Sequence, residues 1–495
     1  MTADRRTVLA LSGAILAGVA GCTSDGDTTD DGTGDPGNGG NGPGNGDAGN
    51  GDAGEEWDDA PAFPEIDPVT EPAIETGRLA RQVRGNVAFS LALLARLREE
   101  EPDANLFFSP YSVSVALAMT YAGADSETAD EMREALRYEL GGEDLHTAFG
   151  ALEDEFERRN EDGEATRASD GERTESASDG EEVEPPEWAE EDGEEDDLGF
   201  QFSSANALWA EERYPFDDDY FALLERYYGA GEHTVDFRGD PEGARREIND
   251  WVEERTNDRI EDLLSEDTID ERTRLVLTNA VYFLAAWEHD FDPAATAPEP
   301  FTSLDGTETE VEMMHQIEEF PYAEVDGHQL VELPYANGDT SMVVLLPAEG
   351  EFERFEESFS VDRLATMLEA ASPREVDLGL PTFGIESEFS LVETMQSLGM
   401  ERAFTEAADL GDMVEGDHEE LYVDDVVHQS FLEVDEEGTE AAAATAVVVS
   451  TTAAMTGETV EMTVDRPFLF YVRDRPTETP LFLGRVVDGG TLQDG

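Results

Sequence analysis

The residues that could carry out covalent, acid–base or metal chemistry form no catalytic motif in this sequence. There is no Gly-x-Ser-x-Gly elbow, no His-Glu-x-x-His helix, no P-loop and no dinucleotide-binding glycine fingerprint. The seven histidines lack metal-ligand spacing, and His233, His289 and His315 each stand alone, so we expect them to be structural. Carboxylates are so numerous that no Asp/Glu pair is informative. We therefore predict that the chain is not an enzyme and has neither a metal site nor a cofactor.

One segment, residues 436–449 (EEGTEAAAATAVVV), has a composition that suits insertion into a sheet rather than catalysis. After its first glutamates it is a run of small, nearly uncharged side chains in a chain rich in carboxylates. In a strand, alternate residues share one face, and here these are small or β-branched: Thr439, Ala441, Ala443, Thr445, Val447 and Val449. Local propensity instead favours a short helix, because Thr439 is a good N-cap and alanine is the best helix former. Both interpretations stay open on this segment alone.

The elements around this run are predicted from apolar periodicity, with helices early in the chain and strands late. This order indicates an α+β fold rather than a wound parallel sheet. The small-residue run connects two strands near the C-terminus, and connections of this length are usually functional. The predicted helices are 83–97, 111–121, 126–136, 145–156 and 248–264, and the predicted strands are 275–283, 341–346, 375–380, 423–434, 467–472 and 481–487.

The N-terminus is typical of an exported lipoprotein. Arg5 and Arg6 form a twin-arginine pair, and residues 8–20 are apolar but too short to span a membrane comfortably. This stretch ends in VAGC at 19–22, the pattern of a lipobox, and Cys22 is the only cysteine of the chain. We expect residues 1–22 to be a twin-arginine signal peptide with Cys22 as the lipidated residue. One lipid chain binds a membrane weakly, so we expect two. The mature protein would be extracellular, tethered to the outer face of the cell membrane.

Two stretches cannot bury a core. Residues 23–65 are mostly Gly, Asp, Asn and Thr, and we expect a disordered acidic linker. Residues from about 158 to 199 are dominated by Glu, Asp, Gly and Ser, and we expect a disordered acidic insertion. The insertion interrupts one globular domain, residues 66–495, which we predict to be a monomer.

The charge of the chain is strongly negative. It has 119 acidic and 30 basic residues, all of them arginine, for a net charge of −89 and a pI near 4.1. Because the acids run along the whole length, we interpret them as a surface kept hydrated in strong salt, typical of a halophilic archaeon. At low salt such a surface repels itself. Nucleic acids and heparin-like polyanions are poor partners for this chain.

Several short motifs of this chain, taken together, point to one protein family. Each motif is weak alone, but their order is specific. They are NLFFSP at 105–110 with Ser112; TNAVYF at 278–283 with Trp287, Phe291, Thr296 and Phe301; ELPY at 332–335; SM at 341–342 and LLP at 345–347; His428 before VDEEGTEA at 434–441; RPFLF at 466–470; and LFLGRV at 481–486. With these motifs in this order, the chain resembles a serpin, a member of a family of suicide inhibitors of serine proteases, from about residue 74 to 488.

The resemblance implies a serpin fold, with helices packed around a large central β-sheet, smaller sheets and an exposed reactive-centre loop. It also implies a mechanism. A protease attacks the loop and forms an acyl-enzyme, and the cleaved loop then inserts into the central sheet. Insertion of this kind is a form of strand addition, for which serpins are a standard example. The resemblance assigns three groups of residues. The hinge is Glu436, Glu437, Gly438, Thr439, Glu440, Ala441, Ala442, Ala443, Ala444 and Thr445; the shutter, a polar cluster beneath the sheet, is Ser109, Ser112, Asn279 and His428; the breach, where the hinge first enters, is Trp287.

The scissile bond implied by the family's usual loop length lies between Thr452 and Ala453. Counting back from the RPF motif gives Thr456 instead, so Ala454, Met455 and Thr456 are alternatives. None of these is basic, which disfavours trypsin-like proteases and favours a secreted subtilisin-like or elastase-like serine protease as partner. Because the insertion is acidic, we expect no activation by heparin-like glycans. A non-inhibitory serpin that acts as a binding or structural protein, and an inhibitor of cysteine proteases, are the alternatives.

Overall fold

The structure is a computed structural model, and it describes residues 63–64, 66, 73–175, 200–230, 233–256, 259–260, 262–266, 268–416, 421–439 and 459–492. For residues 161–175, 200 and 203–205 it describes the backbone alone. The helices are α1 (Thr76–Glu100), α2 (Pro110–Tyr121), α3 (Ser126–Ala135), α4 (Glu143–Glu175), α5 (Asp218–Tyr228), α6 (Pro241–Arg255), α7 (Phe352–Glu357), α8 (Val361–Ala370) and α9 (Val392–Ser397). Within these ranges no helix is long and apolar enough to cross a membrane.

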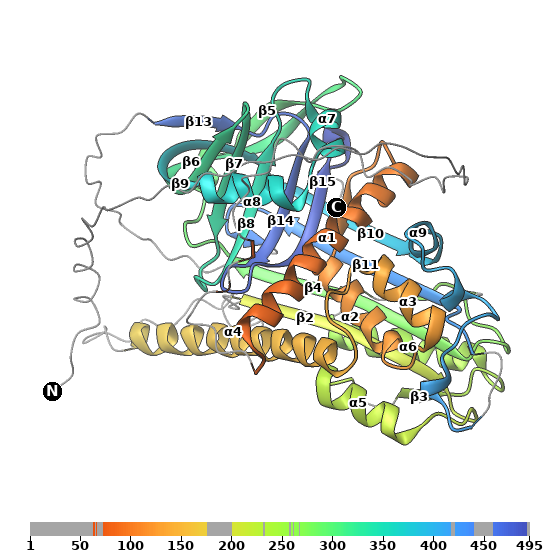
Figure 1. Cartoon of the computed structure of the whole chain (residues 1–495). Helices are drawn as coiled ribbons and strands as arrows, with labels where there is room; N and C mark the ends of the chain where they lie inside the picture. The colour runs from red at the N-terminus through yellow and green to blue at the C-terminus, as the bar shows by residue number, and fades with distance from the viewer. Residues whose placement is uncertain are drawn as a thin grey trace, which may run out of the picture. The chain divides into compact units, whose positions relative to one another are not determined.

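The strands form two sheets (Figure 1). The six-stranded sheet, called the central sheet below, has the order β10 (Phe383–Ser390), β11 (Asp425–Val434), β12 (Gly438–Thr439), β4 (Leu275–Ala286), β2 (Phe200–Glu211) and β3 (His233–Val235). The second sheet has the order β1 (Leu106–Phe108), β15 (Thr479–Val486), β14 (Phe468–Asp474), β8 (Thr340–Leu346), β7 (His328–Pro334), β6 (Glu308–Val325), β9 (Ser372–Pro381) and β13 (Val460–Thr463), with β5 (Ala297–Thr302) paired to β6. The α+β prediction is confirmed.

Strand β4 lies in the middle of the central sheet because its side chains are apolar on both faces. Leu277, Val281 and Phe283 face the main core, while Val276 and Ala280 face a second core built with α6. Helix α2 covers the main-core face and contacts β2 and β4 (Figure 1). It is buried along almost its whole length, as expected for a helix that is apolar on all sides.

The prediction of one helix over 248–264 is wrong in its second half. Helix α6 starts earlier, at Pro241, and ends at Arg255. The Thr256 hydroxyl donates to the Val252 carbonyl oxygen at 2.9 Å and accepts the Ile260 N–H at 3.2 Å, which ends the helix. Leu264 then packs back on the helix, its N–H donating to Asn249 Oδ1 at 2.9 Å. The apolar residues that suggested a longer helix belong instead to the turn that covers it.

Helix α4 is longer than the sequence indicated, and it includes residues 158–175, which we expected in the unstructured insertion. Two features hold its described side chains in place. Arg159 is nearly buried and pairs with Asp474 at 3.1 Å, and Asn160 Nδ2 donates to the Phe202 carbonyl oxygen at 2.8 Å. These polar side chains bind partners more than forty residues away in the sequence. Composition alone does not reveal such contacts, and it therefore suggested disorder. Residues 176–199 lie outside the described ranges.

Candidate functional site

The hinge enters the central sheet at β12, between β4 and β11. Thr439 is the register partner of Val434 on β11 and of Ala285 on β4, both antiparallel. Its side chain is fully buried, and its hydroxyl lies 2.7 Å from the hydroxyl of Tyr335. Burial raises the pKa of Tyr335 far above its usual range, so this phenol remains protonated. The hinge is thus already seated in the sheet at Thr439.

Gly438 is required at the entry because there is no room for a side chain. A Cβ atom at this position would lie 2.3 Å from the Ala285 carbonyl oxygen and 2.8 Å from the Cα of Ala286. Close approach of two backbones is a common reason for glycine in a strand. A β-carbon would therefore push the hinge out of the sheet.

Trp287 lies directly after β4 and holds the hinge from the side. Its backbone N–H donates to the Glu437 carbonyl oxygen and its indole N–H to that of Asp435, both at 3.0 Å. The indole stacks on Tyr335 with ring centroids 4.6 Å apart and planes 5° apart. Trp287 thus holds the backbone just before Thr439, and Tyr335, on which it stacks, contacts the Thr439 side chain.

The shutter residues are brought together where β4 and β11 still pair with each other. These strands are parallel and paired over residues 276–281 and 425–430, and Asn279 is the register partner of His428. His428 Nε2 accepts the Ser109 N–H at 3.2 Å, so His428 Nδ1 carries the proton that it donates to Asn279 Oδ1. Asn279 Nδ2 donates to Ser112 Oγ at 2.6 Å. All four side chains are fully buried.

The network contains a member that the sequence did not indicate, Asn206 on β2. Its Oδ1 accepts from both Ser112 Oγ and Asn279 Nδ2. Burial lowers the pKa of His428 to about 4, which keeps the imidazole neutral. These hydrogen bonds join β2, α2, β4 and β11. The bond between His428 and Asn279 must break if β4 and β11 separate.

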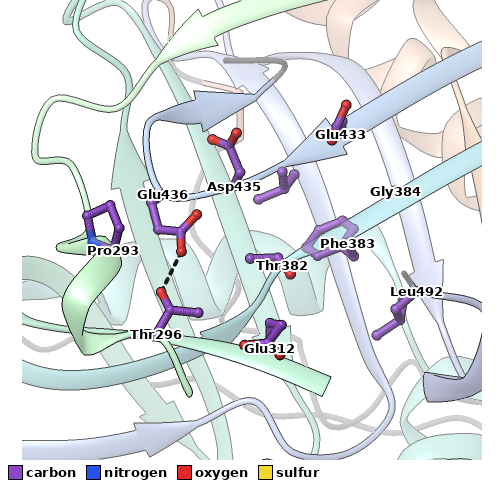
Figure 2. Close-up of a pocket in the computed structure, with 11 residues that line it drawn as sticks. Pro293, Thr296, Glu312, Thr382, Phe383, Gly384, Glu433, Asp435, Glu436 and Leu492 are labelled. Carbon is purple, nitrogen blue, oxygen red and sulfur yellow. Dashed lines mark hydrogen bonds between the residues drawn. The ribbon is translucent and has the colours of Figure 1, made fainter. Parts of the chain in front are cut away.

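A cavity of about 470 Å³ opens beside the hinge (Figure 2). The figure shows a hydrogen bond between two of its lining residues, in which the Thr296 hydroxyl donates to Glu436 Oε1 at 2.5 Å. In the described ranges no group of three His, Cys, Asp or Glu residues is arranged to hold a metal ion. The cavity is lined by Pro293, Thr296, Glu312, Thr382, Phe383, Gly384, Glu433, Val434, Asp435, Glu436 and Leu492.

The remaining predicted site residues fall in two groups. Those from Glu440 to Thr445, the scissile candidates Thr452, Ala453, Ala454, Met455 and Thr456, and Cys22 lie outside the described residues. The isolated histidines have structural surroundings where contacts are described: His233 packs between Trp209 and Trp251, and His315 Nε2 lies 3.0 Å from Glu299. Asn206 gave no signal in the sequence, and Tyr335 stood out only as the last residue of the ELPY motif, because each acquires its role through residues distant in the sequence.

Comparison with known proteins shows that the chain belongs to the serpin family. The family model "Serpin (serine protease inhibitor)" matches residues 84–489. A serpin-like protein of Thermococcus kodakarensis is 37% identical over 78% of this chain and 80% of its own length. Leukocyte elastase inhibitor A of Mus musculus is 34% identical over 81% of this chain and 97% of its own. Uncleaved ovalbumin has a similar structure, with a TM-score of 0.66 and 26% identity over 82% of this chain and all of its own.

Proposed function

We propose that this serpin inhibits a serine protease as a suicide substrate. The protease serine would attack the carbonyl carbon of the scissile bond, form an ester with the loop and release the amine of the next residue. The freed loop would then enter the central sheet as a strand between β4 and β11. The observation that carries this proposal is that Thr439 already lies between these two strands.

The register of β12 supports the path of insertion. Continued by six residues from Thr439, this register would pair Thr445 with Asn279 on β4 and with His428 on β11. The side chains of Asn279 and His428 are hydrogen-bonded to each other in the structure. The incoming threonine would separate them and replace that hydrogen bond with its own. A threonine hydroxyl can both donate and accept, which suits it to a position between an amide and a neutral imidazole.

The loop composition supports insertion without a large energetic penalty. Residues that alternate with Thr439 would share its buried face, and Ala441, Ala443, Thr445 and Val447 are all small and uncharged. A charged side chain on this face would be buried without a partner, at a cost of several kcal/mol.

The target and the location of the protein are part of the proposal. A non-basic bond at Thr452–Ala453, or at the alternatives up to Thr456, favours a subtilisin-like or elastase-like protease over a trypsin-like one. A twin-arginine signal and lipidation at Cys22 would hold the protein at the outer face of the cell membrane, where secreted proteases act. We expect the protein to be a monomer. Given its net charge of −89, we also expect that heparin-like polyanions do not accelerate its inhibition of the protease.

The test is to incubate the full chain with a subtilisin-like protease in molar salt. We expect an SDS-stable species with the mass of the protease plus the chain up to the cut residue. The same protease with its catalytic serine replaced by alanine serves as the control and should give no such species. Cleavage of the loop without a covalent species would indicate a non-inhibitory serpin, and a cut at an arginine would overturn the proposed target class.

A further inference from the structure

The turn that leads from β11 into β12 is closed by the side chain of Asp435. Asp435 Oδ1 accepts the N–H groups of Glu437 at 2.9 Å and Gly438 at 3.1 Å. The Asp435 N–H donates to the Gly438 carbonyl oxygen at 3.0 Å, so Glu436 and Glu437 form a tight two-residue connection. A short carboxylate that accepts backbone N–H groups a few residues ahead is a common device for fixing a turn.

The surroundings of Asp435 favour geometry over charge as its contribution. Burial raises the pKa of Asp435, the two N–H groups act in the opposite direction, and the negative charge of Glu436 adds a smaller increase. Burial raises the pKa values of Asp290 and Glu437 as well, and the negative charge of Asp435 raises both further. In the described ranges no arginine forms an ion pair with these four carboxylates. We infer that the turn depends on the Asp435 oxygen that accepts the two N–H groups and not on the negative charge of the carboxylate.

We propose that Asp435 is a positioning residue for the hinge, and that it sets how often cleavage leads to trapping instead of release. The inference rests on the proposed function. The turn fixes Gly438 and Thr439 in register, and each later loop residue must enter the sheet in the register that this turn sets. Without the turn, entry is slower, and the acyl-enzyme has more time to hydrolyse. Asparagine retains an acceptor oxygen and should replace aspartate, whereas alanine should not.

The experiment compares Asp435→Ala and Asp435→Asn with the unchanged protein, and uses Glu433→Ala as the matched control. Glu433 lines the same cavity two residues away and has no bond to the turn among the described contacts. Two quantities are measured in molar salt: the moles of protein consumed per mole of subtilisin-like protease trapped, and hydrogen exchange at the amides of Glu437, Gly438 and Thr439.

For Asp435→Ala we expect several-fold to roughly tenfold faster exchange at the amides of Glu437 and Gly438, the change that corresponds to one lost hydrogen bond at each amide. The same variant should consume several times more protein per protease trapped. Amides of β4 should remain protected, and Asp435→Asn and Glu433→Ala should behave like the unchanged protein. Unchanged hinge exchange in Asp435→Ala, or failure of asparagine to restore it, would overturn the inference. If the unchanged protein traps no protease, the proposed function fails, and the exchange measurement still decides the role of Asp435.

Discussion

At the scale of single residues, Thr439 is the last hinge residue that the structure describes, and its surroundings define which side chains the position tolerates. It is buried, hydrogen-bonded to Tyr335 and paired on both sides within the sheet. A side chain here must therefore be small and must satisfy one phenol hydroxyl. Neither requirement can be met by a long charged group.

Replacing Thr439 by arginine should convert the inhibitor into a substrate. The guanidinium would be buried without a partner, at a cost of several kcal/mol, so the loop would be cleaved but not inserted. Gel analysis with a subtilisin-like protease should show cleaved chain and little covalent complex. Thr405→Arg, at an exposed turn, is the control and should inhibit normally. Retained inhibition by the Thr439 variant would count against loop insertion along this path.

His428 should make the native fold less stable in acid. Its pKa is lowered by burial to about 4 from its usual value of 6.5. The stabilisation is therefore complete above pH 6.5 and is lost as pH falls toward 4, because the unfolded chain binds the proton first. The loss amounts to about 3 kcal/mol at roughly 1.36 kcal/mol per pKa unit.

The measurement is the free energy of unfolding between about pH 7.5 and 4 in molar salt, for the unchanged protein and for His428→Gln. Burial lowers the pKa of His146 to about 4 as well, so only the difference between the two proteins isolates His428. We expect that difference to shrink by about 3 kcal/mol across this interval. A difference that is constant with pH would show that His428 does not titrate in this way.

At the scale of elements, the pairing between β4 and β11 defines what insertion must change. These strands pair directly over residues 276–281 and 425–430, and β12 separates them near Ala285 and Val434. The shutter residues Asn279 and His428 lie in the directly paired part, and the breach residue Trp287 lies at the end of β4 where β12 is inserted. A strand that extends β12 must open the direct pairs one at a time, reaching Asn279 and His428 at Thr445.

Thr445→Val should weaken the gain in stability that follows cleavage. Valine has nearly the volume of threonine but would leave Asn279 and His428 without the hydroxyl, at a cost of about 1–3 kcal/mol. The expected result is a smaller difference in melting temperature between the cleaved and intact proteins. Thr459→Val, beyond the cleaved bond, is the control and should leave that difference unchanged. An equal effect of both variants would refute the proposed register.

How much of this could be predicted from sequence depends on the range of the contacts. The buried strands inside β4, β8 and β14 and the helix α2 follow from local apolar patterns, and these elements agree with the prediction. Helix α6 differs because Thr256 ends it and Leu264 folds back onto Asn249, and helix α4 differs because Arg159 pairs with Asp474. These partners lie outside the short sequence window in which apolar periodicity is read. The strand character of Gly438–Thr439 has the same origin. Local propensity favours a helix after Thr439, and only Ala285 and Val434 make these two residues a strand.

At the scale of the whole molecule, charge and burial act separately. The surface carries most of the net charge of −89, and its self-repulsion depends on salt. Some ion pairs are instead deeply buried, such as Arg485 with Glu356 at 2.8 Å, where both side chains are 3% exposed. Salt screens such buried pairs much less, so their strength changes little with salt concentration, whereas the repulsion between surface carboxylates changes strongly.

Transfer from molar to millimolar salt should therefore unfold or expand the protein. Counterions at high concentration screen the carboxylates, and their removal restores the repulsion. Circular dichroism should lose signal in dilute buffer and regain it when salt is restored. Sucrose at matched osmolality serves as the control, because it cannot screen charge. A spectrum that is unchanged between the two salt concentrations would contradict this interpretation of the acidic surface.

The most direct test of inhibition by loop insertion is a structure of the protein after cleavage of its loop. We predict a full-length strand between β4 and β11, antiparallel to both, with Thr445 between Asn279 and His428. The direct pairing of residues 276–281 with 425–430 should be gone. A cleaved protein in which those residues remain paired, with Thr439 as the last loop residue in the sheet, would contradict the central claim that this chain traps proteases by loop insertion.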